Sequence, residues 1–174
     1  MMGFKNKTVW ITGASSGIGK ALAIQFSKLG ANVVLSSRKE SDLKEVKKLC
    51  QANTLVLPLD LSLQDNFNEL VRKVSEQFGH IDFLINNGGI SQRSLASETT
   101  LEVDRKLMEV NYFGTIGLTK AILPVMQKQK SGHIITVSSL SGKFGFFLRS
   151  AYSAAKFAQV GFFESLRLEE EKNN

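Results

Sequence analysis

Short apolar runs rich in β-branched residues alternate along the chain with longer segments of helical periodicity. In segment 18–29 the apolar residues recur three and four positions apart, and Gly30 follows where a helix commonly ends. The short runs are typical of strands in a parallel sheet that is covered on both faces. They predict strands at residues 8–11, 31–36, 54–57, 81–85 and 133–137. The periodic segments predict helices at residues 18–29, 40–50, 64–78, 100–129 and 151–170, with Pro124 as a candidate kink.

The alternation of strands and helices predicts an α/β fold, namely a Rossmann-type, doubly wound parallel sheet in a three-layer αβα arrangement. No linker rich in Pro, Gly or Ser interrupts the pattern, so residues 1–174 form one predicted domain. The chain ends on a helix where this pattern leads into another strand, so we expect the C-terminal strands to be missing. The strand at 133–137 is then an apolar edge, and we expect aggregation or dependence on a partner.

Composition excludes several classes of protein. Hydrophobic residues make up 43% and charged residues 22% of the 174, as in folded soluble domains rather than disordered chains. The single cysteine, Cys50, has no partner within the chain, which favours a reducing compartment. The apolar segment near the N-terminus is too short for a signal peptide or an anchor. We therefore expect a cytoplasmic protein with no membrane anchor in this chain.

The positive charge is concentrated in the first third of the chain. The net charge is +6, and residues 1–60 carry 9 Lys and Arg against 4 Asp and Glu. No cluster of Lys and Arg is interleaved with aromatic residues, so we expect no binding of nucleic acid. The excess favours a small ligand that carries phosphate, and plain solvation of the surface is the alternative.

A glycine-rich segment, residues 12–19, lies directly between the first predicted strand and the first helix. Its spacing is Gly-x3-Gly-x-Gly, with Gly13, Gly17 and Gly19. Glycines at such a turn let the backbone approach a pyrophosphate, which the amides at the helix N-terminus then hold. The position between strand and helix favours phosphate binding over an ordinary turn.

The end of the second predicted strand carries cations where an NAD-binding site has a carboxylate. The sequence there is Ser37-Arg38-Lys39, and Glu40 is the first acidic residue. A guanidinium pairs with a phosphate dianion, which a carboxylate at this place repels. The segment therefore predicts NADP(H) in preference to NAD(H), with solvation of a loop as the alternative for Arg38.

Tyr152 and Lys156 lie four residues apart on a predicted helix, so both side chains are on one face. An ammonium close to a tyrosine favours the phenolate form, and such a pair can move a proton to or from a carbonyl oxygen. In isolation this spacing is also an ordinary helix surface.

In combination, the motifs resemble the short-chain dehydrogenase/reductase family. They are segment 12–19, Asn86-Asn87-Gly88-Gly89 after the fourth strand, Asn111 in the long helix, Ser138-Ser139 after the fifth strand, and Tyr152 with Lys156. Segments 86–95 and 111–115 look most like the branch called dehydrogenase/reductase member 7. Gly88 and Ala155 depart from the family, which more often has Ala and Ser there. The resemblance implies that residues 1–174 are a single NAD(P)-binding domain without a metal ion.

The resemblance implies where the cofactor lies. The cofactor-binding residues it implies are Gly13, Ser15, Ser16, Gly17, Ile18, Gly19, Ser37, Arg38, Asp60, Leu61, Asn87, Gly88, Tyr152 and Lys156. Among these, Arg38 meets the 2′-phosphate and Asp60 faces the adenine, while Asn86 supports the strand beside the cofactor.

The resemblance also implies four catalytic residues. Tyr152 donates the proton in the reductive direction, and Ser139 holds the substrate oxygen. Lys156 binds the nicotinamide ribose and favours the phenolate of Tyr152, and Asn111 anchors a water in the proton path. The implied function is an NADP(H)-dependent oxidoreductase that reduces a ketone or aldehyde to an alcohol, or the reverse. The alternative is an inactive nucleotide-binding fragment or interaction module.

The substrate and the oligomeric state are less well defined by the sequence. Phe144, Phe146 and Phe147 are candidates to line a pocket for a hydrophobic carbonyl or alcohol substrate, and packing or subunit contact is the alternative. Family members commonly pair their two long helices, here segments 100–129 and 151–170. We therefore expect a homodimer or homotetramer.

Overall fold

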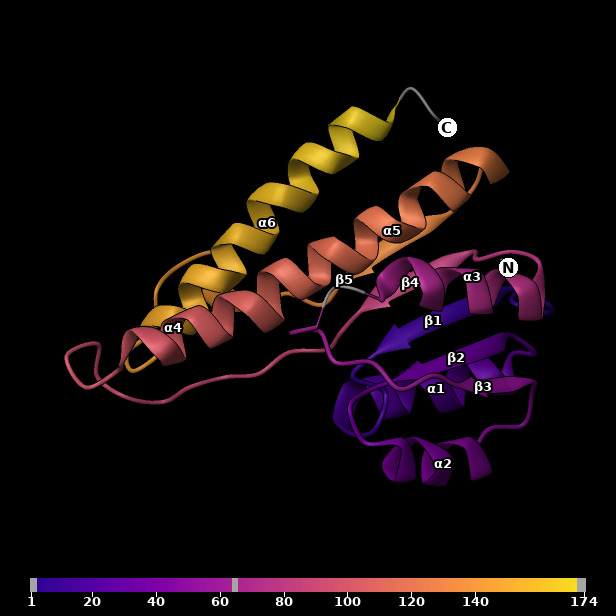
Figure 1. The fold of residues 1–174 in the computed structure, drawn as a ribbon, viewed down its shortest axis with the longest axis horizontal. Coiled ribbons are helices and arrows are strands. Elements are labelled where there is room, and N and C mark those ends of the chain that lie inside the picture. Colours follow the sequence, from indigo (N-terminus) through magenta and orange to yellow (C-terminus); the bar gives the residue numbers. More distant parts are fainter. Residues whose placement is uncertain (1–2, 64–65, 172–174) are drawn as a thin grey trace.

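The computed structural model describes residues 3–63 and 66–171 and places one parallel sheet between layers of helices (Figure 1). The strands are β1 (Thr8–Thr12), β2 (Asn32–Ser36), β3 (Thr54–Val56), β4 (Phe83–Asn86) and β5 (His133–Thr136). The helices are α1 (Gly17–Lys28), α2 (Glu40–Lys48), α3 (Phe67–Phe78), α4 (Leu101–Met108), α5 (Gly114–Gln129) and α6 (Ser150–Glu170). A π-helical segment, η1 (Glu109–Phe113), joins α4 to α5, and a short 3₁₀ turn, η2 (Leu140–Gly142), precedes α6. The expected Rossmann-type fold is confirmed.

The strand order is β3-β2-β1-β4-β5, with every neighbouring pair parallel. The chain therefore moves outward from β1 through β2 to β3 and then returns to place β4 on the other side of β1. At such a reversal the chain leaves β1 and β4 toward helices on opposite faces of the sheet, which opens a crevice at the carboxyl ends of the strands.

Two hydrophobic clusters hold the layers together, one on each face of the sheet. On one face Val9 and Ile11 of β1 pack with Ala23 of α1 and Leu43 of α2. On the other face Trp10 packs with side chains of α3 and α5. The alternation of side chains along β1 explains this division, because successive residues of a strand point to opposite faces. All five residues of β1 are buried, as the uninterrupted apolar run predicts.

The buried polar atom of Trp10 has a partner. Its indole Nε1 donates to Ser36 Oγ at 2.9 Å, and that hydroxyl donates to the carbonyl of Leu57 at 2.7 Å. The contact joins β1 to β2 and to the segment after β3. A buried indole without such an acceptor would lose free energy on folding.

The long helix predicted at 100–129 contains a change of helical pitch. The N–H of Gly114 donates to the carbonyl of Glu109, five residues earlier, which is the π-helical spacing. Pro124 lies inside α5, which continues through it. The change of pitch thus lies at η1, where packing around Asn111, described below, holds the widened turn, and the kink at Pro124 stays a prediction. The predicted helix at 64–78 is α3, and residues 64 and 65 lie outside the described residues.

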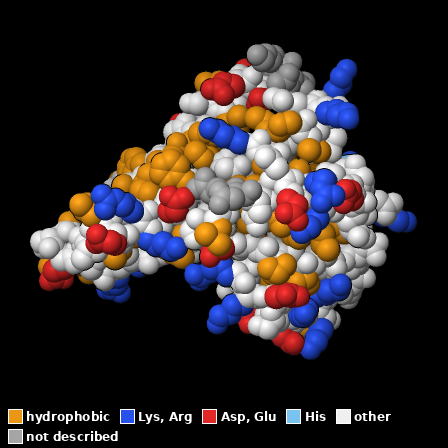
Figure 2. All heavy atoms as spheres, viewed as in Figure 1, with side chains coloured by type: hydrophobic (Ala, Val, Ile, Leu, Met, Phe, Trp, Pro, Cys, Tyr) orange, Lys and Arg blue, Asp and Glu red, His pale blue; other side chains and the backbone are white. Residues whose placement is uncertain are grey.

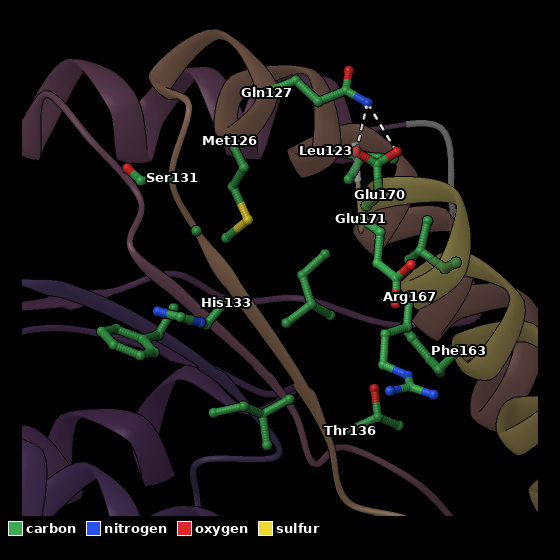
Figure 3. Close-up of a pocket in the computed structure, with 15 residues that line it drawn as sticks. Leu123, Met126, Gln127, Ser131, His133, Thr136, Phe163, Arg167, Glu170 and Glu171 are labelled. Atoms are coloured by element: carbon green, nitrogen blue, oxygen red, sulfur yellow. Dashed lines mark hydrogen bonds between the residues drawn. The ribbon is translucent and has the colours of Figure 1, made fainter. Parts of the chain in front are cut away.

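The expected edge strand is present, since β5 is the last strand in the described sheet. Ile135 is 44% exposed, in contrast to the buried residues of β1. A groove of about 710 Å³ runs between β5, α5 and α6, with Met126 and Phe163 among its lining residues (Figure 3). Gln127 Nε2 donates to both carboxylate oxygens of Glu170 across this groove, at 3.0 and 3.1 Å.

Figure 2 shows hydrophobic side chains gathered in a band over the region of the long helices. Exposed apolar side chains on these helices include Leu101, Val103, Phe113 and Phe157. Within residues 3–63 and 66–171, no helix combines the length and apolar character that crossing a bilayer requires.

Gly114, the first residue of α5, packs directly on the segment after β3. A Cβ atom at this position would lie 2.0 Å from the carbonyl oxygen of Leu61. We expect Gly114→Ala to lower the free energy of unfolding by at least about 1–3 kcal/mol, because backbone must move to relieve the overlap. Urea unfolding followed by circular dichroism measures this change.

Gly161→Ala is the matched control, because a Cβ at this position in α6 meets nothing within 4 Å. We expect this variant to gain up to about 1 kcal/mol through the higher helix propensity of alanine. Equal stabilities of the two variants would contradict the packing at Gly114.

Candidate active site

A cavity of about 900 Å³ opens at the carboxyl ends of β1, β2 and β4, where the strand order reverses. Most of the cofactor-binding residues that the sequence implies line it. They are Gly13, Ser15, Ser16, Gly17, Ile18, Ser37, Arg38, Asp60, Leu61, Asn87 and Gly88. Four predicted segments, far apart in sequence, therefore meet at one crevice.

The glycine-rich turn between β1 and α1 admits little besides glycine. Gly13 has φ +65°, and a Cβ there would lie 2.8 Å from the Cα of Gly88. Gly19 does not line the cavity; it lies beneath the turn, where a Cβ would meet the carbonyl oxygen of Gly13 at 2.3 Å. The backbone of the turn thus faces the crevice directly. The N-terminus of the 12-residue helix α1 points its first amides the same way, which suits an anion.

Hydrogen bonds fasten this turn to the segment after β4. Thr12 Oγ1 accepts from the backbone N–H of Asn87 at 3.0 Å and of Gly88 at 2.9 Å. Asn87 Nδ2 donates in return to the carbonyls of Thr12 at 3.0 Å and Gly13 at 3.3 Å. These four hydrogen bonds hold together the two segments that form the floor of the cavity. The sequence analysis includes Thr12 in the glycine-rich segment but assigns it no role. A hydroxyl next to a glycine turn is a candidate acceptor for nearby backbone N–H groups, and this could have identified it.

The side of the cavity near β2 carries the charges that the sequence indicates. Arg38 is exposed at the rim, and Ser37 Oγ is buried with no hydrogen-bond partner among the described residues. Burial raises the pKa of the Asp60 carboxyl, but hydrogen bonds from the backbone N–H and Oγ of Ser62 outweigh this effect. Lys106 and Arg38 also lower the pKa, so the net shift is downward and Asp60 is anionic at neutral pH.

Tyr152 and Lys156 lie on the same face of α6, as their spacing predicts. Lys156 Nζ is 5.8 Å from the centre of the Tyr152 ring. Lys156 is only 5% exposed, and its Nζ donates to the carbonyl of Val137 and to Gln159 Oε1, each at 3.0 Å. Burial lowers the pKa of the Lys156 ammonium to about 8.

Asn111 lies in η1 and is fully buried. Its side chain forms a reciprocal pair with Ile90, because Nδ2 donates to the Ile90 carbonyl and Oδ1 accepts from the Ile90 N–H, both at 2.8 Å. This pair holds the segment after β4 against the long helix. The side chain of Asn111 is thus engaged by protein, and its main-chain carbonyl accepts a hydrogen bond from Gln159 Nε2.

Ser139 lies at the start of η2, after β5. Its Oγ accepts from the backbone N–H of Ser141 at 3.1 Å, and no hydrogen bond joins it to Tyr152 in the described part of the chain. The η2 turn packs on α6, where a Cβ at Gly142 would lie 3.1 Å from the carbonyl oxygen of Lys156. Ser139 therefore lies beside the turn that packs on the helix carrying Tyr152.

Two residues near Tyr152 were missed by sequence reasoning. Arg149 donates to the carbonyl of Gln92 at 2.7 Å and to Ser91 Oγ, and its guanidinium carbon lies 5.9 Å from the centre of the Tyr152 ring. Gln159 contacts Lys156. Arg149 precedes Tyr152 by three residues at the start of α6, and Gln159 follows Lys156 by three residues on that helix. Residues three apart are neighbours on a helix surface, so this spacing could have pointed to both.

The arrangement suits a long, phosphate-bearing ligand. The crevice has a glycine floor, a helix N-terminus, a cation at one rim and a carboxylate at the adjacent wall. Asn111 and Ile90 tie the far end of the crevice to η1, which contacts α6 and hence the Tyr152–Lys156 pair. The groove at β5 contains none of the predicted site residues.

Comparison with known proteins agrees with this geometry. The family model described as short chain dehydrogenase matches residues 7–174. The human protein "Dehydrogenase/reductase SDR family member 7" is 49% identical over 168 residues, which cover 92% of this chain and 50% of that protein. The chain spans about half the length of the curated relatives it matches.

Solved structures match over the whole described fold. A metagenomic short-chain oxidoreductase in complex with NADP has a TM-score of 0.91 and 30% identity, covering 98% of this chain and 79% of that one. A short chain dehydrogenase/reductase from Burkholderia phymatum in complex with NAD has a TM-score of 0.94 and 27% identity, covering 100% of this chain and 63% of that one.

The lowered pKa of Lys156 predicts how stability depends on pH. Between about pH 8 and 10.5 the unfolded chain holds a proton on this lysine that the folded chain has lost. The stability of the folded state therefore rises with pH through this window, by up to roughly 3 kcal/mol from this group. We expect the free energy of unfolding of the native chain, relative to that of Lys156→Met, to increase from pH 8 to pH 10.5 in urea titrations.

Lys128→Met, at an exposed position on α5, controls for the loss of one lysine. If the free energy of unfolding depends on pH in the same way for the native chain and for Lys156→Met, the lowered pKa of Lys156 is contradicted.

Proposed function

The chain belongs to the short-chain dehydrogenase family, and we propose that it transfers a hydride between NADP(H) and the carbon of a carbonyl or alcohol substrate. The observation that carries the proposal is the Tyr152–Lys156 pair on α6, with a buried ammonium 5.8 Å from the tyrosine ring. An oxidoreductase of this kind needs a group that gives a proton to the oxygen as the hydride reaches the carbon.

The cavity fits a dinucleotide on two structural grounds. Gly13 and Gly19 let the turn pack closely enough to leave its backbone facing the cavity, since a Cβ atom at either position would meet backbone within 2.8 Å and displace the turn. The buried Ser37 Oγ lacks a partner in the described chain, and a ligand at this wall would supply one. When bound, the nicotinamide cofactor supplies or accepts the hydride.

Arg38 supports NADP(H) over NAD(H). It lines the cavity directly after β2 together with Lys39, so the local charge is positive where the adenosine ribose of a bound cofactor would lie. A guanidinium there binds a 2′-phosphate through paired hydrogen bonds. The two solved relatives differ, one with NADP and the other with NAD, so the preference rests on this chain's own residues.

In the reductive direction Tyr152 donates its phenolic proton to the substrate oxygen, and the Ser139 hydroxyl holds that oxygen. Two hydroxyl donors aimed at one oxygen stabilise the negative charge that develops there. Lys156 favours the phenolate that remains on Tyr152 and offers an N–H to the ribose of the cofactor. Asn111 holds the segment after β4 through Ile90 and so fixes the wall beside the nicotinamide.

The aromatic residues after η2 support a hydrophobic carbonyl or alcohol as substrate. The rings of Phe144 and Phe146 lie 5.2 Å apart, and both are about half exposed, at 54% and 42%. The exposed Phe113 and Phe157 on the long helices support a homodimer or homotetramer through these helices.

A second candidate function is a nucleotide-binding or interaction module without turnover. The observation that favours it is the exposed edge of β5 beside the 710 Å³ groove, which offers unpaired backbone groups to another chain. An oxidoreductase oxidises or reduces its bound cofactor, whereas a binding module leaves it unchanged.

Cofactor choice is tested by thermal unfolding with NADPH and with NADH. A ligand at a hundredfold excess over its dissociation constant stabilises the folded state by about 2.7 kcal/mol. We expect NADPH to raise Tm more than NADH does, and Arg38→Ala to remove most of the difference. Arg72→Ala, in an exposed ion pair on α3, is the control. Equal shifts with the two cofactors would contradict the proposed role of Arg38.

Turnover is tested with Tyr152→Phe and, as the matched control, Tyr112→Phe. We expect Tyr152→Phe to lower kcat at least about 100-fold with NADPH and acetophenone or cyclohexanone, while NADPH binding is retained, because only the proton donor is removed. Tyr112 lies in η1 and packs against Phe113 and Phe162, so its hydroxyl is dispensable. Unchanged turnover in Tyr152→Phe refutes the mechanism, and bound cofactor without turnover in any form favours the module.

A further inference from the structure

Gln159 is a polar side chain buried in the interior, one helical turn beyond Lys156 on α6. It is 2% exposed and is among the largest fully buried side chains. An amide at such a position loses its hydrogen bonds to water on folding, so the protein must replace them. Its partners therefore show what the residue does.

Within residues 3–63 and 66–171, its three hydrogen bonds go to residues around the proposed reaction site. Gln159 Oε1 accepts from Lys156 Nζ at 3.0 Å. Gln159 Nε2 donates to the main-chain carbonyl of Asn111 and, more weakly, to Thr115 Oγ1 at 3.4 Å. One amide thus links α6 to η1 and to the start of α5.

The π-helical turn explains how this carbonyl is reached. In an α-helix each carbonyl is occupied by the N–H four residues later. Asn111 lies in η1, where the N–H of Gly114 bonds five residues back to Glu109 and the turn is wider. A side-chain donor from a neighbouring helix can then approach a carbonyl of that turn, and Gln159 does so.

The contact also sets the direction of the Lys156 ammonium. An ammonium has three N–H donors. Within the described chain, two of them go to interior acceptors, the Val137 carbonyl and Gln159 Oε1. The third is left for the side of the helix on which Tyr152 lies, 5.8 Å away from Nζ to the ring centre.

We propose that Gln159 is a positioning residue: its amide is anchored on the main-chain carbonyl of Asn111, holds the Lys156 ammonium through Oε1 and keeps one N–H of that ammonium directed toward Tyr152 and the cofactor. This inference rests on the proposed function, since it concerns the same reaction. Among the described residues, the hydrogen bonds of Gln159 go to Lys156, Asn111 and Thr115 and not to Tyr152, so it acts through Lys156.

A neutral amide suits this role better than an ionised group. It accepts from the ammonium without forming an ion pair, and burial then keeps the pKa of Lys156 low, at about 8. An amide also passes on no proton unless it becomes an imidic acid. Gln159 therefore orients Lys156 and does not relay its proton.

The test uses two substitutions at one position. Gln159→Met fills the buried volume but removes both hydrogen-bonding ends. Gln159→Glu keeps an acceptor for Lys156, removes the donor to Asn111 and introduces a negative charge. Gln127→Met, on α5 at the β5 groove, is the matched control because it exchanges the same residue types away from Lys156.

The first measurement is the titration of Lys156, followed through its side-chain carbon signal in protein labelled with carbon-13 lysine and assigned by loss of the peak in Lys156→Met. We expect Gln159→Glu to raise the titration midpoint by at least about one pH unit, because an anion stabilises the ammonium. We expect Gln159→Met to lower it, and Gln127→Met to leave it unchanged. A midpoint that is unchanged in both Gln159 variants overturns the proposal.

The second measurement is turnover with NADPH and acetophenone. We expect Gln159→Met to lower kcat at least about tenfold with KM and NADPH affinity within about twofold, and Gln159→Glu to shift the pH profile of kcat in the direction of its Lys156 titration. If kcat falls only in proportion to the loss of thermal stability and the Lys156 titration is unchanged, Gln159 has a purely structural role and the proposal is overturned. If Gln159→Met does not fold, the Gln159→Glu titration and pH profile decide.

Failure of the proposed function is separate from failure of this inference. A native chain that binds NADPH without turnover refutes the oxidoreductase activity, whereas the Lys156 titration still reports whether Gln159 holds the ammonium.

Discussion

The close backbone approach between the turn after β1 and the segment after β4 is the contact on which the rest of the site depends. Thr12 Oγ1 accepts from two consecutive backbone amides of that segment, and the Cα of Gly88 lies only 2.8 Å from the position that a Cβ of residue 13 would take. This contact is possible because β1 and β4 are parallel neighbours that end at the same edge of the sheet. The crevice, the exposed amides of α1 and the position of Ile90 all follow from it.

A second constraint is the burial of a cation in the helical layer. In the described part of the chain, Lys156 donates to two neutral acceptors, a carbonyl and an amide, and burial lowers the pKa of its ammonium. Burying the ammonium costs free energy, which its two hydrogen bonds partly offset. Burial also places the ammonium beside Tyr152. Groups whose charge is destabilised in this way cluster at functional sites, which agrees with the proposed role of the pair.

Much of the fold follows from local patterns in the sequence. Uninterrupted apolar runs such as β1 indicate buried parallel strands, and Gly13 with Gly19 marks the turn where backbone must approach closely. The spacing of Tyr152 and Lys156 places them on one helical face. The π-helical turn at η1 could not be predicted in this way, since no residue type encodes it and contacts of Asn111 with Ile90 and Gln159 stabilise it.

By itself, the sequence determined the order of strands and helices, the glycine turn, the cationic end of β2 and the helical register of Tyr152 and Lys156, because these depend on neighbours within a few residues. Only the tertiary structure decided which partners Lys156 has, since Val137 comes from the end of β5 and Gln159 is held by Asn111 and Thr115 from another helix. These hydrogen bonds join residues 19, 48 and 44 positions apart, and they exist only once the sheet and helices have packed. The chemistry at Lys156 is set by those bonds and by the burial that packing imposes.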